Sequence, residues 1–433
     1  MKLQGPRGTR DFYPDDMAWR RRLEDAWRTV SVRHGFEEVD GPIFETQELY
    51  KIKSGDGILS EIFHVKHPQG DAEFALRPEF TPTLARMVAA RANGLPKPIK
   101  WFATPNFCRA ERPQRGRLRE FWQWNADILG SESALADAEC ILVAIDLLRE
   151  FGLSNQHIVV RISHREVVRH ILERLGVTDD KMVNAFELLD RREKLEHDDF
   201  VKQATELGLD GPKVERFLQM TRRRYPVGEI DHLVRSVGMD GGFEKLRELD
   251  EQLVAFGIAD WCAYDLGIVR GLAYYTGTVF ELHEASGMER AVAGGGRYDK
   301  LIELFGGPAM PAVGFGMGDV VLTNVLQDKG LLPEDVTPRP DVFVLPASET
   351  GNTQLRSVVA NLREQGIHAR FSYKTTTNLG KLLKDANQSR ARFALLLGDD
   401  TPSGQAELKD LDSGDQAIIQ LTDLPNHLAT PTD

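Results

Sequence analysis

Polar side chains that could bind a charged ligand are concentrated in residues 101–130, which read as two strands joined by a charged loop. Alternation along the second strand places Gln123, Asn125 and Asp127 on one face. The opposite face is apolar and aromatic, with Trp122, Trp124, Ala126 and Ile128. Amides and carboxylates are poor strand formers, so a ligand on the polar face is one explanation. An ordinary half-buried strand with its polar face in water is the alternative.

The loop between these strands, residues 112–120, is rich in arginine. The first strand ends with Arg109 and Glu111 on one side. The loop then adds four arginines around a proline and a glycine: Arg112, Arg115, Arg117 and Arg119. Guanidinium groups bind phosphate through two parallel hydrogen bonds, so a mobile hairpin tip of this composition indicates a phosphate-bearing ligand.

The order of these residues resembles a known motif. The run from Phe107 to Glu111, followed by the Arg-Gly loop and a strand, resembles motif 2 of the class II aminoacyl-tRNA synthetases, which has an Arg-x-Glu core. The longer run ERPQRGRLREFWQ, residues 111–123, is similar to histidyl-tRNA synthetases. A second block, residues 266–281, resembles the R-G-x-D-Y-Y motif of that family, with Arg270 at its start. Ala273 stands where that motif has aspartate.

This resemblance implies a site for histidine and ATP. Arg109 and Arg270 would contact the α-phosphate and the substrate carboxylate, Glu111 would meet adenine, and Arg117 would contribute to ATP binding. The residues implied for the histidine pocket are Glu79, Thr81, Gln123, Asp127, Tyr274, Tyr275 and Tyr298. Of these, Glu79, Thr81 and Gln123 would hold the ammonium, and Asp127 and Tyr275 the imidazole nitrogens. Mg²⁺ should arrive with ATP.

Simpler interpretations exist for several of these residues. Thr81 is suited to cap the helix expected from residue 83, and Glu79 to face solvent. The two tyrosines at 274 and 275 are compatible with core packing. The glycines of residues 293–299, which resemble a glycine-rich floor of the family, would also suit a flexible hairpin turn.

Residues 311–318 occupy the place of motif 3, a strand running into a helix. In many class II enzymes this helix supplies an arginine to the γ-phosphate of ATP, and the corresponding position here is Val321. We therefore hypothesise that an arginine of the 112–119 loop, Arg117 or Arg119, contributes instead.

The elements around these motifs predict an α+β catalytic domain on an antiparallel sheet, residues 1–327. An amphipathic helix over residues 17–34, capped by Asp15 or Asp16, and a strand over residues 36–45 resemble motif 1, where the family forms its homodimer interface. Residues 176–258 read as almost wholly helical, which suggests an insertion that touches the tRNA acceptor arm.

A linker over residues 328–340 is rich in proline and precedes a last domain, residues 341–433. Its βαβαβ order predicts a small α/β domain with a mainly parallel sheet, and it resembles the anticodon-binding domain of several class II synthetases. Residues 356–392 hold eight Lys or Arg and two acids, which suits contact with tRNA.

Composition is that of an ordinary globular protein of 433 residues, with a formal charge of −12. That charge argues against indiscriminate binding of polyanions. The three cysteines are scattered and no metal site is expected. No segment resembles a signal peptide or a membrane span, so a cytoplasmic location is expected.

The function implied by the resemblance is a histidine–tRNA ligase that uses ATP to join histidine to tRNA(His). The alternative is a catalytically silent paralogue that acts as the regulatory subunit of ATP phosphoribosyltransferase. Val321 and Ala273 favour the paralogue slightly. The polar motifs and the C-terminal domain, which such regulatory relatives generally lack, favour the enzyme.

Overall fold

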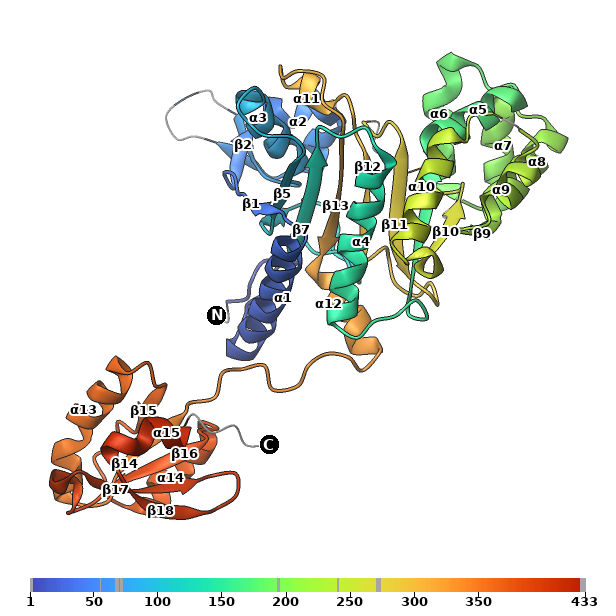
Figure 1. Ribbon diagram of the computed structural model, residues 1–433. Helices are drawn as coiled ribbons and strands as arrows, with labels where there is room; N and C mark the ends of the chain where they lie inside the picture. Colours follow the sequence, from blue (N-terminus) through green and yellow to red (C-terminus); the bar gives the residue numbers. More distant parts are fainter. Residues whose placement is uncertain are drawn as a thin grey trace. The chain divides into compact units, whose positions relative to one another are not determined.

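The computed structural model describes residues 3–54, 56–66, 70, 73–192, 195–239, 241–269 and 274–428. The chain forms two compact units, Met1–Glu334 and Asp335–Asp433 (Figure 1). The division falls within the segment expected to be a linker. The limits 1–327, 328–340 and 341–433 stay predictions.

The first unit is built on one large, mostly antiparallel sheet, as the sequence predicts. Its strands in spatial order, within the described residues, are β1 (Glu37–Glu38), β5 (Ile99–Ala103), β7 (Glu120–Leu129), β13 (Ala312–Gly318), β12 (Ala293–Arg297), β11 (Thr278–Glu284), β8 (Ile158–His164), β10 (Cys262–Asp265) and β9 (Arg224–Pro226). A short strand β6 (Asn106–Cys108) also pairs with β7. The pairs β1/β5 and β8/β10 are parallel.

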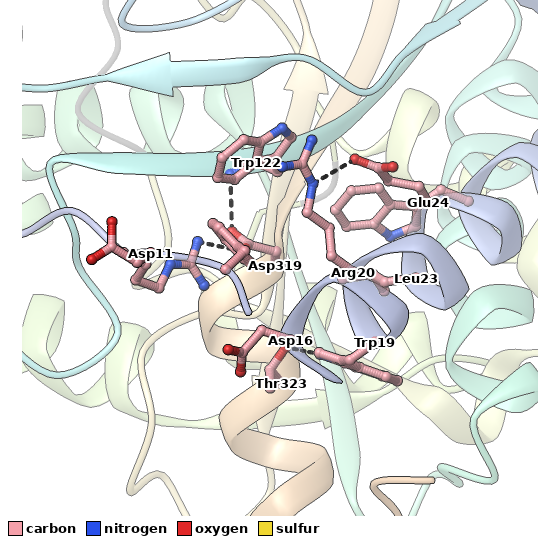
Figure 2. A pocket seen from close by; sticks show the side chains of 12 residues that line it. Asp11, Asp16, Trp19, Arg20, Leu23, Glu24, Trp122, Asp319 and Thr323 are labelled. Atoms are coloured by element: carbon pink, nitrogen blue, oxygen red, sulfur yellow. Dashed lines mark hydrogen bonds and ion pairs between the residues drawn. The ribbon is translucent and has the colours of Figure 1, made fainter. Parts of the chain in front are cut away.

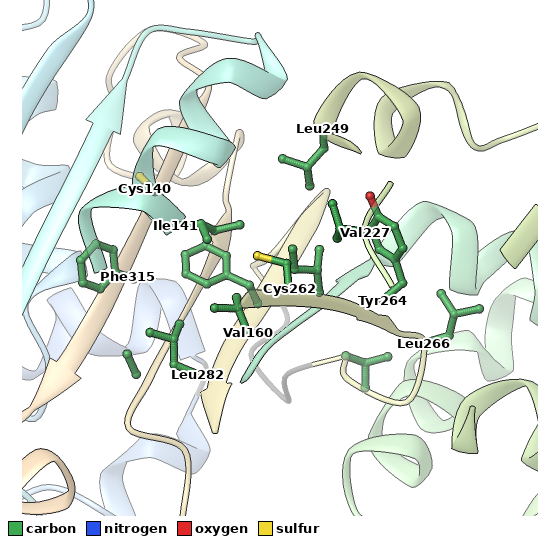
Figure 3. Close-up of a cluster of buried hydrophobic side chains, with 14 of the residues drawn as sticks. Cys140, Ile141, Val160, Val227, Leu249, Cys262, Tyr264, Leu266, Leu282 and Phe315 are labelled. Atoms are coloured by element: carbon green, nitrogen blue, oxygen red, sulfur yellow. The ribbon is translucent and has the colours of Figure 1, made fainter. Parts of the chain in front are cut away.

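One face of this sheet is covered by three helices, α1 (Pro14–Arg33), α4 (Ala134–Glu150) and α12 (Asp319–Asp328) (Figure 1). The indole of Trp124 is fully buried there and donates a hydrogen bond to the hydroxyl of Ser31 at 2.9 Å. The same core continues across the sheet toward β10, where Val160, Cys262 and Leu282 are buried (Figure 3). The apolar face predicted for β7 therefore anchors the strand and fixes which way its polar face points.

The opposite face carries α3 (Thr81–Arg91) and α11 (Leu301–Leu304), with a separate core that includes Phe80, Phe107 and Leu129. Beside it lies a small sheet of β2 (Phe44–Thr46), β4 (Glu73–Leu76) and β3 (His64–Lys66), together with α2 (Gln47–Ser54). The single strand expected over residues 36–45 is wrong. The chain breaks at Gly41-Pro42, where Arg77 binds the Gly41 carbonyl at 2.9 Å, and β1 and β2 join different sheets.

Helix α5 (Arg165–Leu175) precedes the expected insertion, residues 176–258, which contains helices α6 (Met182–Asp190), α7 (His197–Glu206), α8 (Gly211–Arg222), α9 (Ile230–Val237) and α10 (Glu244–Ala255). The prediction that it is almost wholly helical missed β9, which pairs with β10 and so ties the insertion to the main sheet. A three-residue strand carries too little alternation to be recognised from sequence.

Helix α1 begins at Pro14, three residues earlier than expected. Proline fits the first position of a helix because its missing N–H needs no partner there. Asp16 lies within the first turn, and its carboxylate accepts a hydrogen bond from the backbone N–H of Tyr13 at 3.0 Å. No described helix has both the length and the apolar character needed to cross a membrane.

The second unit has a five-stranded sheet in the order β15 (Ala369–Phe371), β14 (Val342–Pro346), β16 (Phe393–Leu397), β17 (Gln405–Asp410) and β18 (Gln416–Gln420). Its helices are α13 (Glu349–Glu364), α14 (Leu379–Gln388) and α15 (Leu424–Leu428). The expectation of a mainly parallel sheet is wrong, because β17 and β18 add two antiparallel pairs. Their acidic and polar residues, such as Glu407 and Asp410, hid them in the sequence.

Candidate active site

A pocket on the polar face of β7 brings together residues from segments far apart in the chain. Its lining is Glu79, Thr81, Arg109, Gln123, Asn125, Asp127, Tyr274, Tyr275, Gly294, Tyr298, Gly314, Phe315 and Gly316. Every residue predicted for histidine binding is in this set, together with Arg109. Arg270, the other predicted phosphate contact, lies outside the described residues, as does Ala273.

The floor of the pocket depends on glycines that face the polar side chains of β7. In the pairing of β7 with β13, Gly314 lies opposite Asp127 and Gly316 opposite Asn125. A Cβ on Gly316 would lie 2.7 Å from the amide carbon of Gln123, and one on Gly314 would collide with the carboxylate of Asp127. Only glycine leaves these side chains room to stand upright on the sheet.

The triple glycine at residues 294–296 lies inside β12 and is not the flexible hairpin turn considered as an alternative. A Cβ on Gly296 would approach the ring of Tyr275 to 2.9 Å. The strand is also held from behind, because Arg297 forms a buried ion pair with Asp137 of α4. The glycine-rich stretch is therefore a rigid part of the pocket wall.

Asp127 is the buried carboxylate at the end of the pocket. Its Oδ1 accepts a short hydrogen bond from the hydroxyl of Tyr298. Burial raises the pKa of Asp127 from 3.8 to about 7, although the Tyr298 hydroxyl and the charge of Lys53 act in the opposite direction. Burial and the neighbouring Asp127 raise the pKa of Tyr298 well above its usual value, so this phenol remains a donor. The pair can offer an acceptor to a ligand N–H in a site shielded from water.

Three tyrosines form an aromatic wall next to Asp127. The ring centroids of Tyr274 and Tyr275 are 4.5 Å apart, and those of Tyr274 and Tyr298 are 6.0 Å apart at nearly right angles. Tyr275 and Tyr298 also belong to the core on this face of the sheet. Packing and pocket lining are thus combined in the same rings, and the simple core interpretation of the double tyrosine is incomplete.

Glu79 and Thr81 enter the pocket from the start of α3. The helix is capped by Phe80, without a side-chain hydrogen bond, so Thr81 is the first helical residue and does not serve as the cap. The Glu79 carboxylate is paired with the ammonium of Lys53, whose side chain is 0% exposed. Glu79 does not simply face solvent.

Lys53, which contacts two residues of the pocket lining, is the main neighbour of the pocket that sequence reasoning missed. Its Nζ lies 4.1 Å from the ring centroid of Tyr274, in addition to its ion pair with Glu79. Nothing in the run KIKSG distinguishes it from a surface lysine. Asn125 was also absent from the predicted set, although its place between Gln123 and Asp127 on one strand face was a usable signal.

Arg109 is held at the edge of the pocket in a fixed orientation. Its Nε donates to the carbonyl of Pro78 at 3.0 Å, and its guanidinium lies 5.1 Å from the ring centroid of Phe121. Arg109 and Glu79 line the same pocket. A cation fixed in this way suits a carboxylate or phosphate ligand.

The arginine-rich loop was expected to be a mobile tip, but its arginines contact acidic and carbonyl groups within the loop and on neighbouring segments. Arg117 donates to Oε1 of Glu111 at 2.5 Å, and Arg115 is paired with Glu289 and Asp328. Arg119 contacts the carbonyl of Glu111 at 3.2 Å. Among the described residues, Oε2 of Glu111 is buried without a hydrogen-bond partner. That oxygen is available to a ligand with an N–H group.

A second cavity lies on the other face of β7, around Trp122 (Figure 2). Arg10 of the N-terminal arm donates to Asp319 at 2.6 Å, and the same carboxylate accepts from the backbone N–H of Trp122 at 3.0 Å. Arg20 stacks 3.7 Å from the Trp122 ring centroid. These contacts fasten the arm and α1 to β7 and α12, so they position the sheet without reaching the pocket.

No group of three or more His, Cys, Asp or Glu side chains in the described ranges is arranged to hold a metal ion. The three cysteines are free, and burial is the main cause of the raised pKa values of their thiols.

Comparison with known proteins identifies the family. Residues 8–319 match the model of the family described as histidyl-tRNA synthetase, and residues 341–430 match that of the anticodon binding domain. The chain belongs to the histidyl-tRNA synthetase family. The resemblance drawn from motifs 2 and 3 and from the Tyr-Tyr block is confirmed, and so is the expected class of the C-terminal domain.

Relatives of this family match over almost the full chain. Histidine–tRNA ligase of Haloarcula marismortui is 36% identical over 98% of both chains, and that of Opitutus terrae is 39% identical over 93% of both. The crystal structure of histidyl-tRNA synthetase from Nostoc sp. PCC 7120 is similar with a TM-score of 0.81 and 25% identity, over 99% of both chains.

A further structure, from Bacillus halodurans, is titled ATP phosphoribosyltransferase regulatory subunit/histidyl-tRNA synthetase. It has a TM-score of 0.74 over 91% of this chain but only 22% identity, so it shares the fold. Val321 stands where the resemblance to motif 3 predicts an arginine. It is 7% exposed and belongs to the core, and it cannot bind phosphate.

Proposed function

We propose that the protein activates L-histidine with ATP, releasing pyrophosphate, and then transfers histidine to the 3′ end of tRNA(His). The observation that carries this proposal is the single pocket that joins Glu79, Asp127 and Tyr298 to Arg109. It offers carboxylates to an ammonium and an imidazole at one end, and a guanidinium to a carboxylate or phosphate at the other.

In the proposed complex, the imidazole lies between Asp127 and the tyrosines. One oxygen of Asp127 is bound by Tyr298, and the other would accept the N–H of the imidazole. Tyr275 would donate to the second ring nitrogen, and Tyr274 would line the ring. Side chains without a donor and an acceptor at this spacing would leave the second oxygen of Asp127 buried without a partner, which is costly.

The ammonium of histidine would be held by Glu79, Thr81 and Gln123. Glu79 is paired with Lys53, so histidine would bring a second cation to this carboxylate. The histidine carboxylate would then extend toward Arg109, which the Pro78 carbonyl holds in place.

The nucleotide would occupy the arginine-bearing edge of the pocket. Arg109 and Arg270 would contact the α-phosphate, Glu111 would meet the adenine amino group through its unpaired Oε2, and Arg117 would approach the phosphates. Mg²⁺ would enter with the triphosphate as part of the substrate.

The chemistry needs no protein nucleophile. A carboxylate oxygen of histidine attacks the α-phosphorus, the bond from that phosphorus to the bridging oxygen breaks, and pyrophosphate leaves with the electron pair. The tRNA ribose hydroxyl then attacks the histidyl carbonyl and AMP leaves. The protein contributes alignment of the two reactants and neutralisation of charge in the transition state.

For tRNA, we propose that the C-terminal unit contacts the anticodon region and that the helical insertion contacts the acceptor arm. The family match of residues 341–430 and the basic run at residues 356–392 support the first contact. We further propose a cytoplasmic homodimer formed through the motif 1 region. Ile43 and Phe44 there are 45% and 48% exposed, and an interface would cover them.

The test is aminoacylation of purified tRNA(His) by the purified protein with labelled histidine. We expect label in the tRNA that depends on ATP and on the tRNA species. Histidine binding without charging, and without histidine-dependent exchange of pyrophosphate into ATP, would instead support the regulatory paralogue.

A further inference from the structure

A partly buried arginine that the sequence motifs do not include lies beside Val321, the position where motif 3 predicts an arginine. Arg290 belongs to the connection between β11 and β12. A Cβ placed on Gly116, at the tip of the arginine-rich loop, would lie 3.3 Å from Cγ2 of Val321 and 3.6 Å from Cδ of Arg290. Val321 and Arg290 therefore flank the same point of the loop.

The guanidinium of Arg290 also has unused hydrogen-bonding capacity. Its Nη1 is buried and has no hydrogen-bond partner among the residues that the structure describes. A buried charged donor without an acceptor is unfavourable, and such groups in a native protein commonly await a ligand. The neighbouring residue Glu289 is 3% exposed and bound to Arg115, which holds this connection against the loop.

The charges around Arg290 are those of the proposed nucleotide site. Burial lowers the pKa of Arg290, the positive charges of Arg117 and Arg109 lower it further, and the carboxylate of Glu111 opposes them. Three guanidinium groups thus share one carboxylate. This excess of positive charge favours a polyanion, whose binding relieves the repulsion.

We propose that Arg290 binds the β- and γ-phosphates of ATP and takes over the role of the arginine that Val321 replaces. This inference rests on the proposed function and identifies the group that stabilises the departing pyrophosphate. It adds a third arginine to the hypothesis that Arg117 or Arg119 of the loop contributes, since both of these already contact Glu111. Val321 lies next to Gly116 of the arginine-rich loop, and its apolar side chain leaves the phosphate free to bind Arg290.

The test separates the two steps of the reaction. The variant Arg290→Gln removes the charge, and we expect kcat/KM for ATP in histidine-dependent pyrophosphate exchange to fall by about 10-fold to 100-fold, since a charge-assisted hydrogen bond is lost. The KM for pyrophosphate in ATP synthesis from histidyl-adenylate should rise in parallel. Transfer of histidine from supplied histidyl-adenylate to tRNA should stay within about twofold of wild type, because no pyrophosphate remains in that step.

Two further variants guard against a purely structural explanation. Arg290→Lys keeps the charge and should retain more exchange activity than Arg290→Gln. The double variant Arg290→Gln/Val321→Arg restores the usual position and should recover about tenfold over the single variant. Arg149→Ala, which removes a 43% exposed arginine of α4, is the matched control and should leave exchange unchanged.

Exchange by Arg290→Gln within twofold of wild type would overturn the inference, as would an equal loss in the transfer step. If the double variant exchanged pyrophosphate no faster than Arg290→Gln, arginines at positions 290 and 321 could not serve the same phosphates, which would contradict the inference. Wild-type protein without histidine-dependent exchange would instead overturn the proposed function, so the two failures are distinguishable.

Discussion

The two ends of the pocket are built by different means. At the end that we propose for histidine, Asp127 of β7 is paired in register with Gly314 of β13, and Tyr298, directly after β12, donates a hydrogen bond to Asp127. The end that we propose for phosphate has Arg109, at the end of a strand, in its lining, with Arg117 of the loop and Arg290 of the connection between β11 and β12 close by.

This difference follows from what each ligand requires. Selecting imidazole among neutral side chains of similar size needs donors and acceptors at fixed positions, in a site where an unpaired group is costly. Binding a triphosphate needs concentrated positive charge, which tolerates exchange of one arginine for another from a different element. Val321, where the resemblance predicts an arginine, belongs to the end proposed for phosphate, at which such an exchange is tolerated. Among the described residues of the end proposed for histidine, none differs from the family motif in this way.

The largest effect should follow from removing the acceptor at the histidine end. Asp127→Ala should lower histidine-dependent exchange at least about 100-fold, because a hydrogen bond to a charged group is lost in a buried site. The protein should remain folded, as judged by its circular dichroism and its melting temperature. A variant with unchanged rate and selectivity would remove Asp127 from the pocket.

A second prediction concerns how the free energy of unfolding changes with pH because the carboxylate of Asp127 is buried. Because the pKa of Asp127 is raised to about 7, the folded protein keeps a proton that the unfolded chain releases above about pH 4. This residue's contribution to stability is therefore present at low pH and is lost as the pH rises through 7. Between pH 5 and pH 8, the wild type should lose about 2 to 3 kcal/mol relative to Asp127→Asn in urea unfolding. Parallel pH curves for the two proteins would show that Asp127 is not perturbed.

The glycine floor offers a steric test of the same end. Gly316→Ala places a methyl group 2.7 Å from the amide carbon of Gln123 and should raise the KM for histidine about tenfold. Gly211→Ala is the control, because a Cβ at Gly211 meets no atom within 4 Å. Equal KM values for histidine in the two variants would show that the strands around Gly316 can shift to accept a methyl group.

The smallest expected effect is that of salt concentration, which should change the KM for ATP more than the KM for histidine. Raising the salt from about 0.05 M to about 0.5 M shortens the Debye length and should raise the KM for ATP several-fold. The KM for histidine should change by less than about twofold, since its contacts are buried and short. A larger change for histidine than for ATP would reverse the comparison drawn above.

Much of the histidine end could be predicted from the sequence. Period-two alternation in residues 121–129 gave the correct face for Gln123 and Asp127, and the family motifs brought in Glu79 and Tyr298. The motifs could not reveal Lys53 or Arg290, since each is a single basic residue in an unremarkable run. Their importance arises only from burial and from neighbours distant in sequence.

Errors in the predicted fold have a similar origin. The strand expected over residues 36–45 ran through Gly41 and Pro42, and the sequence did not reveal that the chain would break there, with Arg77 bound to the carbonyl of Gly41. Strands β9 and β18 were missed because β9 is very short and β18 has four exposed residues out of five. Such strands are defined by their partners in the sheet rather than by their own pattern.

The measurement that tests the central claim most directly is amino-acid-dependent exchange of pyrophosphate into ATP, with each of the twenty amino acids, by wild type and Asp127→Ala. We expect the wild type to catalyse exchange with histidine alone and Asp127→Ala to lose this activity. Asp179→Asn, a control at a residue whose side chain is 80% exposed, should behave as the wild type. Exchange supported equally by another amino acid, or histidine selectivity that survives Asp127→Ala, would contradict the central claim.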